Sequence, residues 1–242
     1  MRFSLIVAMV GRADQLLRFL TSVDAQTYRD FELIVVDQNS DDRVMLILAF
    51  YQNNFPIHHL RTQEKGASRA RNIGLQHVSG NVVAFPDDDC KYPADLLAMV
   101  ARILDGRPKL DGVAVCSVDE EGRVSNGRLD ERSGPINGSN AWAHAIEYTM
   151  FLREQSVRGL RFDERIGPGA GTPLGAGEET DYLCSYWSEK HPYTMTLAWW
   201  SYTLWLYHPM TREPWLELTP TVPVWDTFSR STRGQYGLRQ AG

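Results

Sequence analysis

Short apolar runs alternate with amphipathic segments through the first half of the chain, and this order limits the possible fold more than any other feature. The runs are rich in strand-forming residues, while the segments between them carry apolar residues at helical spacing. The expected strands are Phe3–Met9, Glu32–Asp37, Ile57–Leu60, Val82–Phe85 and Gly112–Ser117. The expected helices are Ala13–Val23, Val44–Tyr51, Gly66–His77 and Pro93–Leu104. Strands that alternate with helices form a mainly parallel sheet with helices on both faces, so we expect an α/β fold.

The second half of the chain has a different residue pattern. Between residues 119 and 140 it becomes polar and rich in glycine, which predicts a loop or hairpin. Ordered patterning returns over 141–158, and a glycine-rich stretch at 167–177 precedes a helix that we expect to begin at Glu178. A length of 242 residues with 43% hydrophobic residues suits a single domain with a core of ordinary size.

The charge of the chain argues against a nucleic-acid partner. The formal net charge is −5, whereas a nucleic-acid-binding protein normally carries a basic excess. Acidic residues gather at 37–42, 87–89 and 178–181, so a cation is the more natural partner. A polyanionic ligand would then need that cation as a bridge.

Targeting signals are weak in this sequence. The three cysteines lie far apart without a CxxC pair, which fits a reducing cytosol. The apolar start, Phe3 to Val10, is followed by Gly11-Arg12-Ala13-Asp14 where a signal peptide has its cleavage site, so a buried strand is expected instead. The apolar stretch from Tyr193 to Tyr207 is shorter than the roughly 20 residues that a bilayer requires. We expect a cytoplasmic protein and leave peripheral contact with the inner face of the membrane open.

The triplet Asp87-Asp88-Asp89 is the first candidate for chemistry. Adjacent carboxylates repel one another, and the cost rises as the local dielectric falls. A solvated turn before the next helix is one interpretation. The triplet, however, follows the expected strand Val82–Phe85, and ligands of parallel sheets bind beyond the carboxyl ends of the strands, where Asp37 also lies. Mg²⁺ and Mn²⁺ use one or two carboxylates plus substrate phosphates, so we predict a divalent cation here.

Glu178 and Glu179 form a second acidic cluster. Acidic residues at the start of a helix stabilise its dipole, and that role alone could explain them. The preceding loop holds more glycines than a helix entry needs, and a mobile loop can present a carboxylate as a general base once a site closes. Both interpretations stay open on the residues alone.

Two further features each have a structural and a functional interpretation. Lys65, Arg69 and Arg71 could form a solvated helix face, or pair with a diphosphate. His208 could be a surface residue, or a nitrogen ligand for the cation held by the triplet.

Together these segments resemble the family 2 glycosyltransferases, which are inverting enzymes of the GT-A fold. The resemblance runs from Phe3 to about His208 and depends on the order of its segments. They are Ser4–Arg12, Glu32–Asp41, Gly66–Gly74, Gly80–Asp89 with Tyr92-Pro93, Phe162–Gly167 and Gly177–Asp181. The resemblance implies a Rossmann-like, mixed and mainly parallel sheet flanked by helices. It also implies a domain over 1–210, with a nucleotide-sugar-binding half at 1–118 and an acceptor-side half at 141–210, followed by a C-terminal tail of uncertain structure at 211–242.

The resemblance also implies an activity. It is the inverting transfer of a sugar from a UDP-, dTDP- or GDP-sugar to a hydroxyl of a glycan or lipid-linked acceptor, in bacterial-type polysaccharide or glycan biosynthesis. Asp87, Asp89 and His208 are the implied ligands of Mn²⁺ or Mg²⁺, and Glu179 is the implied catalytic base with Glu178 as the alternative. The implied donor-binding residues are Arg12, Asp37, Gly66, Arg71, Asn72 and Asp88.

Three other classes of protein are alternatives to a glycosyltransferase. A dehydrogenase should carry GxGxxG after the first strand, and Met9 to Asp14 holds a single glycine. A nucleotidyltransferase also binds nucleotide and metal, but its glycine-rich basic loop after the first strand is missing. A non-catalytic sugar-nucleotide-binding protein stays open, because Trp199, Trp200 and Trp205 and the tail after Pro209 depart from the family pattern. These departures fall on the acceptor side of the family pattern.

Overall fold

The computed structural model describes residues 1–119, 134–138, 140–189 and 197–206. The sheet of this part has nine strands, in the order β3-β2-β1-β4-β8-β6-β9-β5, and β7 also pairs with β9. Its first four strands run parallel: β1 (Phe3–Met9), β2 (Phe31–Asp37), β3 (Ile57–Arg61) and β4 (Val82–Ala84). Every residue of β2 is buried, as expected for a strand covered on both faces.

The other half of the sheet is mixed. β8 (Met150–Arg153) runs antiparallel between β4 and β6 (Gly112–Val118), and β9 (Leu197–Leu206) runs parallel to β6. Two short strands, β5 (Cys90–Lys91) and β7 (Gly134–Ile136), pair antiparallel with β9. The predicted mixed, mainly parallel α/β sheet is therefore confirmed.

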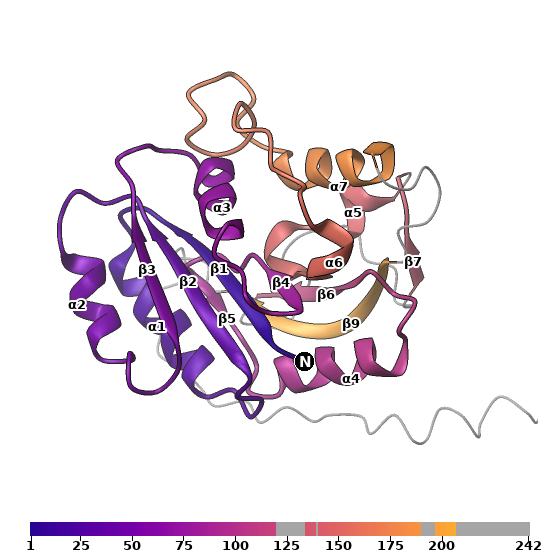
Figure 1. Ribbon diagram of the computed structural model, residues 1–242, viewed down its shortest axis with the longest axis horizontal. Coiled ribbons are helices and arrows are strands. Elements are labelled where there is room, and N and C mark those ends of the chain that lie inside the picture. Colours follow the sequence, from indigo (N-terminus) through magenta and orange to yellow (C-terminus); the bar gives the residue numbers. More distant parts are fainter. Residues whose placement is uncertain (120–133, 139, 190–196, 207–242) are drawn as a thin grey trace, which may run out of the picture. The chain divides into compact units, whose positions relative to one another are not determined.

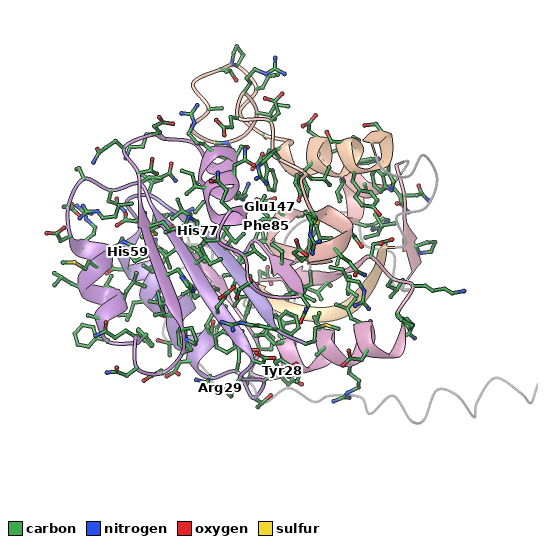
Figure 2. The ribbon with its side chains drawn as sticks, viewed as in Figure 1. Tyr28, Arg29, His59, His77, Phe85 and Glu147 are labelled. Carbon is green, nitrogen blue, oxygen red and sulfur yellow. The ribbon has the colours of Figure 1, made fainter. Side chains whose placement is uncertain are left out.

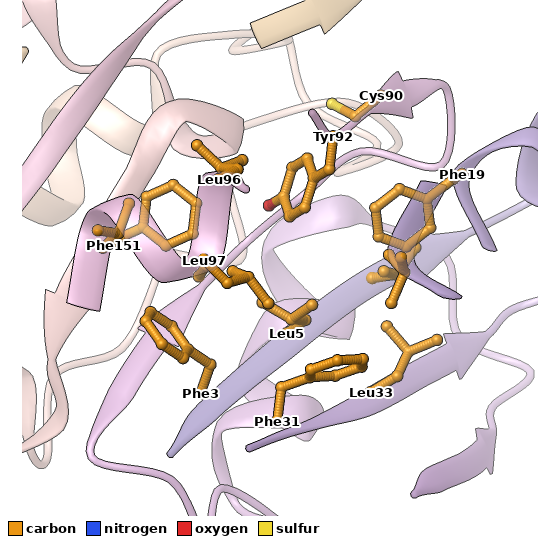
Figure 3. Packing of buried hydrophobic residues seen from close by; sticks show 14 of the residues in the cluster. Phe3, Leu5, Phe19, Phe31, Leu33, Cys90, Tyr92, Leu96, Leu97 and Phe151 are labelled. Carbon is orange, nitrogen blue, oxygen red and sulfur yellow. The ribbon is translucent and has the colours of Figure 1, made fainter. Parts of the chain in front are cut away.

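Helices cover both faces of the sheet (Figure 1). The helices α1 (Ala13–Asp24), α2 (Arg43–Ala49) and α4 (Leu96–Gly106) pack in one apolar cluster with alternate residues of β1, among them Phe3 and Leu5. Figure 3 shows this cluster, in which Phe19 of α1 and Leu97 of α4 lie near Leu5 of β1. Elements on the opposite face pack against Ile6 and Ile34. They are α3 (Ala67–Leu75), α5 (Ala141–His144), α6 (Glu154–Val157) and α7 (Glu178–Glu189).

Several predicted boundaries were wrong by a few residues. The helix expected from Pro93 begins at Leu96, because Pro93 to Asp95 form an extended entry and a turn. The region at 119–140, predicted as a loop or hairpin, contains the short strand β7. The ordered region at 141–158 holds a 3-10 turn, η1 (Glu147–Thr149), that the pattern did not reveal. Residues 211–242 lie outside the described part, so the predicted division at residue 210 stays a prediction.

Candidate active site

Loops after neighbouring strands meet at the carboxyl edge of the parallel strands. Gly11, after β1, donates its backbone N–H to Asn39 Oδ1 at 2.7 Å, which ties it to the loop after β2. Arg12 reaches from the same loop to the acidic triplet after β4. The edge that sequence reasoning selected for ligand binding therefore brings Arg12, the residues after Asp37 and the triplet together.

The acidic triplet is paired with Arg12. The guanidinium lies 2.8 Å from Asp89 Oδ2 and 3.0 Å from Asp88 Oδ1. Asp88 is only 1% exposed, and its two oxygens have no well-aligned hydrogen bond, whereas half of Arg12 is exposed. Burial raises the pKa of Asp88 to about 7. Enclosure by the protein, and then the negative charge of Glu147, raise the pKa of Asp87 to about 7 as well.

These groups fit a divalent cation. Asp87 and Asp89 offer the hard oxygen ligands that Mg²⁺ and Mn²⁺ take. The poorly satisfied carboxylate of Asp88 adds negative charge that a cation would offset. His208, the third predicted ligand, lies outside the described residues, so its contribution stays a prediction.

Arg71 of α3 is buried and lies close to three carboxylates. Its Nη1 lies 2.8 Å from Glu178 Oε1, and its Nη2 lies 3.1 Å from Glu147 Oε1 and 3.5 Å from Asp87 Oδ1. The guanidinium carbon also lies 5.5 Å from the centre of the Phe162 ring, within the range of a cation–π contact. With 4% of its side chain exposed, Arg71 joins the acidic triplet to the start of α7.

Three glutamates converge beside Arg71. Carboxylate oxygens of Glu147, Glu178 and Glu179 lie within 4.8 Å of one another. Such a group could hold a cation, but Arg71 already supplies positive charge to two of its members. Within the described residues, no ion pair includes Glu179, and burial raises the pKa of its carboxyl group. Glu179 is thus the member best placed to take a proton, while Glu178 holds Arg71.

Sequence reasoning missed Glu147. Figure 2 labels this residue, which lies in η1 and brings its carboxylate within 4.8 Å of those of Glu178 and Glu179. Burial raises the pKa of its carboxyl group, and Arg71 opposes that shift. No local pattern could have revealed it, because it meets Arg71 and Glu178 only through contacts between segments that are distant in the chain.

Gly66 and Asn72 fix the glycine-rich region onto α3. Gly66 has φ 129° and packs against Gly169, while Ala67 N donates to Pro168 O at 2.9 Å. The Asn72 amide donates to Phe162 O and accepts from Phe162 N, each at 2.9 Å. The structure therefore shows both residues as supports of the loop that leads to Glu178, and their contact with a donor stays a prediction.

Asp37 ends β2 and is fully buried. Its Oδ1 accepts from the backbone N and the side-chain amide of Asn39, and its Oδ2 lies 2.9 Å from His59 Nε2. The predicted donor-binding aspartate is thus enclosed by two neighbours.

The sequence of the chain identifies the family to which this edge of an α/β sheet, with its clustered carboxylates, belongs. A sequence model of the family described as Glycosyl transferase family 2 matches residues 4–165, which is more than half of the chain. The chain belongs to this family, as the sequence resemblance predicted.

Curated relatives agree with this assignment. The uncharacterized glycosyltransferase YibD of Escherichia coli (strain K12) is 27% identical over 175 residues, covering 65% of this chain and 50% of that protein. The minor teichoic acid biosynthesis protein GgaB of Bacillus subtilis (strain 168) is 26% identical over 182 residues, covering 71% and 20%. The poly(ribitol-phosphate) beta-N-acetylglucosaminyltransferase TarS of Staphylococcus aureus (strain Mu50 / ATCC 700699) is 30% identical over 109 residues, covering 43% and 19%. The chain thus spans half or less of the length of these relatives.

Solved structures share the fold. S. aureus TarS 1–349 superposes with a TM-score of 0.70 at 20% identity, covering 85% of this chain and 60% of that chain. It has also been solved in complex with UDP-GlcNAc. The mannosyltransferase PcManGT from Pyrobaculum calidifontis, in complex with GDP-Man and Mn²⁺, gives 0.60 at 20% identity, covering 84% and 56%. These likenesses show the GT-A fold predicted from the sequence. Among the described residues, no helix has the length and apolar character needed to cross a membrane.

Proposed function

We propose that this chain is a metal-dependent, inverting glycosyltransferase acting between a nucleoside-diphosphate sugar and an acceptor hydroxyl. The observation that carries the proposal is the Arg71 bridge between Asp87 after β4 and Glu178 at the start of α7. A cation site for a leaving diphosphate and a basic carboxylate for an acceptor must lie side by side for this reaction, and the bridge joins their candidates. The non-catalytic alternative does not require this link.

The proposed chemistry assigns one task to each side chain. Glu179 accepts the proton of the acceptor hydroxyl as that oxygen bonds to the anomeric carbon. The bond between that carbon and the diphosphate oxygen breaks on the opposite side, so the configuration inverts. Burial raises the pKa of Glu179, which makes it a stronger base near neutral pH.

The negative charge of the leaving nucleoside diphosphate must be offset by positive charge. Asp87 and Asp89, with His208 as a further candidate, would hold Mn²⁺ or Mg²⁺, which supplies that charge. Arg12 is half exposed and can pair with a phosphate, whereas Arg71 is occupied by carboxylates and holds the site together.

The substrate classes follow the relatives. Complexes of TarS with UDP-GlcNAc and of PcManGT with GDP-Man support a UDP-, dTDP- or GDP-sugar donor. The names of GgaB and TarS support a cell-wall polymer, or a lipid-linked precursor of one, as acceptor. An acceptor of this kind favours a peripheral position of the protein at the inner face of the membrane.

Replacing Glu179 tests the base assignment. Glu179→Gln keeps the size of the side chain and removes its basicity, so we expect transfer to fall by roughly 10²–10⁴-fold, the usual contribution of general-base catalysis. Donor binding, measured by calorimetry, should change less than about twofold. Glu64→Gln is the control, because that glutamate is exposed and lies in the loop before α3. Full transfer activity in Glu179→Gln would remove the base from the mechanism.

The cation assignment has its own test. We expect UDP or GDP to raise the Tm of the wild-type protein more with Mn²⁺ than without it, because a ligand that binds only the native state stabilises it. Asp89→Asn should abolish the metal-dependent part. If no nucleotide stabilises the wild type in a metal-dependent way, the donor-site proposal fails.

A further inference from the structure

The contact between His59 and Asp37 joins two neighbouring strands near their carboxyl ends. His59 lies in β3 and Asp37 is the last residue of β2, and the strands pair in parallel. Figure 2 labels His59 on β3, the strand at one end of the sheet order. The Nε2 atom lies 2.9 Å from Asp37 Oδ2. The pair is therefore part of the same sheet edge as the acidic triplet.

Asp37 is enclosed, whereas His59 is accessible. Asp37 has 0% of its side chain exposed, and the Asn39 backbone and side chain occupy its Oδ1 at 2.9 and 2.8 Å. The His59 side chain is 21% exposed. A ligand that approaches this part of the edge therefore meets the imidazole before it meets the carboxylate.

Asp37 also sets the tautomer of His59. A carboxylate oxygen accepts hydrogen bonds, so Nε2 carries the proton that it donates to Asp37. In the neutral ring, Nδ1 is then left with a lone pair. Nδ1 of His59 has no hydrogen-bond partner among the described residues, so this acceptor is free for a ligand.

The strand order sets the distance between this acceptor and the triplet, which can be compared with the length of a nucleoside diphosphate. In the strand order β3-β2-β1-β4, His59 and the triplet are three strand spacings apart. At about 4.8 Å per spacing this is roughly 14 Å. An extended nucleoside diphosphate has its base at one end and its diphosphate at the other, so a diphosphate at the triplet leaves the base near β2 and β3.

We propose that His59 recognises the nucleobase of the donor, with its Nδ1 accepting a ring N–H and Asp37 holding the ring in place. This proposal rests on the proposed function. It assigns the direct contact to His59 and a positioning role to Asp37. It also selects bases with a ring N–H on the pairing edge, which uracil, thymine and guanine have and cytosine and adenine lack.

The experiment separates base recognition from phosphate binding. Calorimetry with Mn²⁺ compares UDP, GDP and inorganic pyrophosphate, which has no base, on the wild type and on His59→Lys. The lysine ammonium can still donate to Asp37, but it has no lone pair that could accept a ring N–H. We expect the nucleotides to lose up to about tenfold in affinity, the scale of one hydrogen bond, while pyrophosphate stays within about twofold.

The chain offers a matched control. His58 is the preceding residue in β3, so its side chain points to the other face of the sheet, where it lies 3.4 Å from Glu32. His58→Lys should leave all three affinities unchanged. The N-methylated form of the better nucleotide, which lacks the ring N–H, should bind the wild type as weakly as the parent nucleotide binds His59→Lys.

Each remaining outcome is decisive. Unchanged nucleotide affinity in His59→Lys overturns the proposal. Equal losses for nucleotide and pyrophosphate also overturn it, because they show that His59 supports the fold of the whole site. A wild type that binds pyrophosphate with Mn²⁺ but no nucleotide overturns the base contact and leaves the cation assignment standing. A wild type that binds neither overturns the donor site itself.

Discussion

Arg12 occupies oxygens that a divalent cation would need. Its guanidinium pairs with Asp88 and Asp89 from the loop after β1, and half of the side chain remains exposed. A cation that enters the site must compete with this charge. Once the cation is bound, the released guanidinium can pair with a phosphate. Arg12 should therefore weaken metal binding in the ligand-free protein and strengthen donor binding in the metal-loaded protein.

Arg12→Gln tests both effects, because it removes the charge and keeps a polar side chain. Without nucleotide, Mn²⁺ should bind the variant roughly 3–10-fold more tightly, the scale of one partly exposed ion pair of about 1 kcal/mol. With saturating Mn²⁺, UDP should bind several-fold more weakly. Calorimetry measures both constants, and Arg18→Gln on the exposed side of α1 is the control. Weaker Mn²⁺ binding by Arg12→Gln would contradict this account.

At the scale of elements, the loop before α7 depends on close packing against α3. Ser68 donates to Ile166 O at 2.6 Å, and Ala67 N donates to Pro168 O. Gly167 has φ 105°, and a Cβ there would lie 2.9 Å from Glu178 Cδ and 3.1 Å from Ser68 Oγ. A side chain at this position would push Glu178 away from Arg71. The glycine is therefore needed both for its backbone conformation and for the space it leaves.

Gly167→Ala should accordingly lower the free energy of unfolding by more than the roughly 1–2 kcal/mol of left-handed backbone strain. It should also reduce transfer activity, because the Glu178–Arg71 contact positions the neighbouring Glu179. Gly171→Ala is the matched control, since Gly171 has φ 73° but nothing within 4 Å of its added Cβ. Urea unfolding and transfer assays measure the two effects. Equal losses in both variants would show that the contact with Glu178 is unimportant.

The elements of this fold were largely predictable from the sequence. β1 and β2 were found because strands covered on both faces need nearly continuous apolar residues, as in Ile34-Val35-Val36. Short elements were not found, because β7 and η1 take their conformation from their neighbours in space. The helix after the triplet was placed too early because Pro93 suits a helix start as well as the turn that it forms.

The candidate site was predictable only in part, for the same physical reason. Asp87, Asp89 and Glu179 lie where strand ends and a helix start are visible in the sequence. Two partners of Arg71, Glu147 and Glu178, are 76 and 107 positions away in the chain, so only the packed structure reveals them. The His59 contact depends on the register between β2 and β3, which local patterns do not determine.

At the scale of the whole molecule, the site gathers more negative than positive charge. Six carboxylates, those of Asp87, Asp88, Asp89, Glu147, Glu178 and Glu179, surround the guanidinium groups of Arg12 and Arg71. Two arginines cannot neutralise six carboxylates. Burial raises the pKa of Asp87 and Asp88 to about 7 and raises that of Glu147, so the protein offsets part of this charge by taking up protons.

The stability of the metal-free protein should therefore fall as pH rises. Asp87 and Asp88 have an ordinary pKa of 3.8, and their folded-state pKa is about 7. Between these values the native state binds more protons than the unfolded state, so the free energy of unfolding decreases from about pH 4 to about pH 7. Mn²⁺ needs the ionised carboxylates, so the stabilisation that it adds should grow over the same range.

Urea unfolding at about pH 5.5 and about pH 8, with and without Mn²⁺, measures both trends. Asp88→Asn removes one titrating carboxyl group without changing the shape of the side chain, so it should flatten the pH dependence of the metal-free protein and stabilise it at the higher pH. Glu64→Asn or Glu64→Gln, on the exposed loop before α3, should leave the slope unchanged. If the metal-free protein instead gains stability from about pH 5.5 to about pH 8, the buried carboxylates are already ionised and balanced within the chain. The site would then have no excess charge for a cation to relieve, and the electrostatic basis for metal binding at the triplet would be lost.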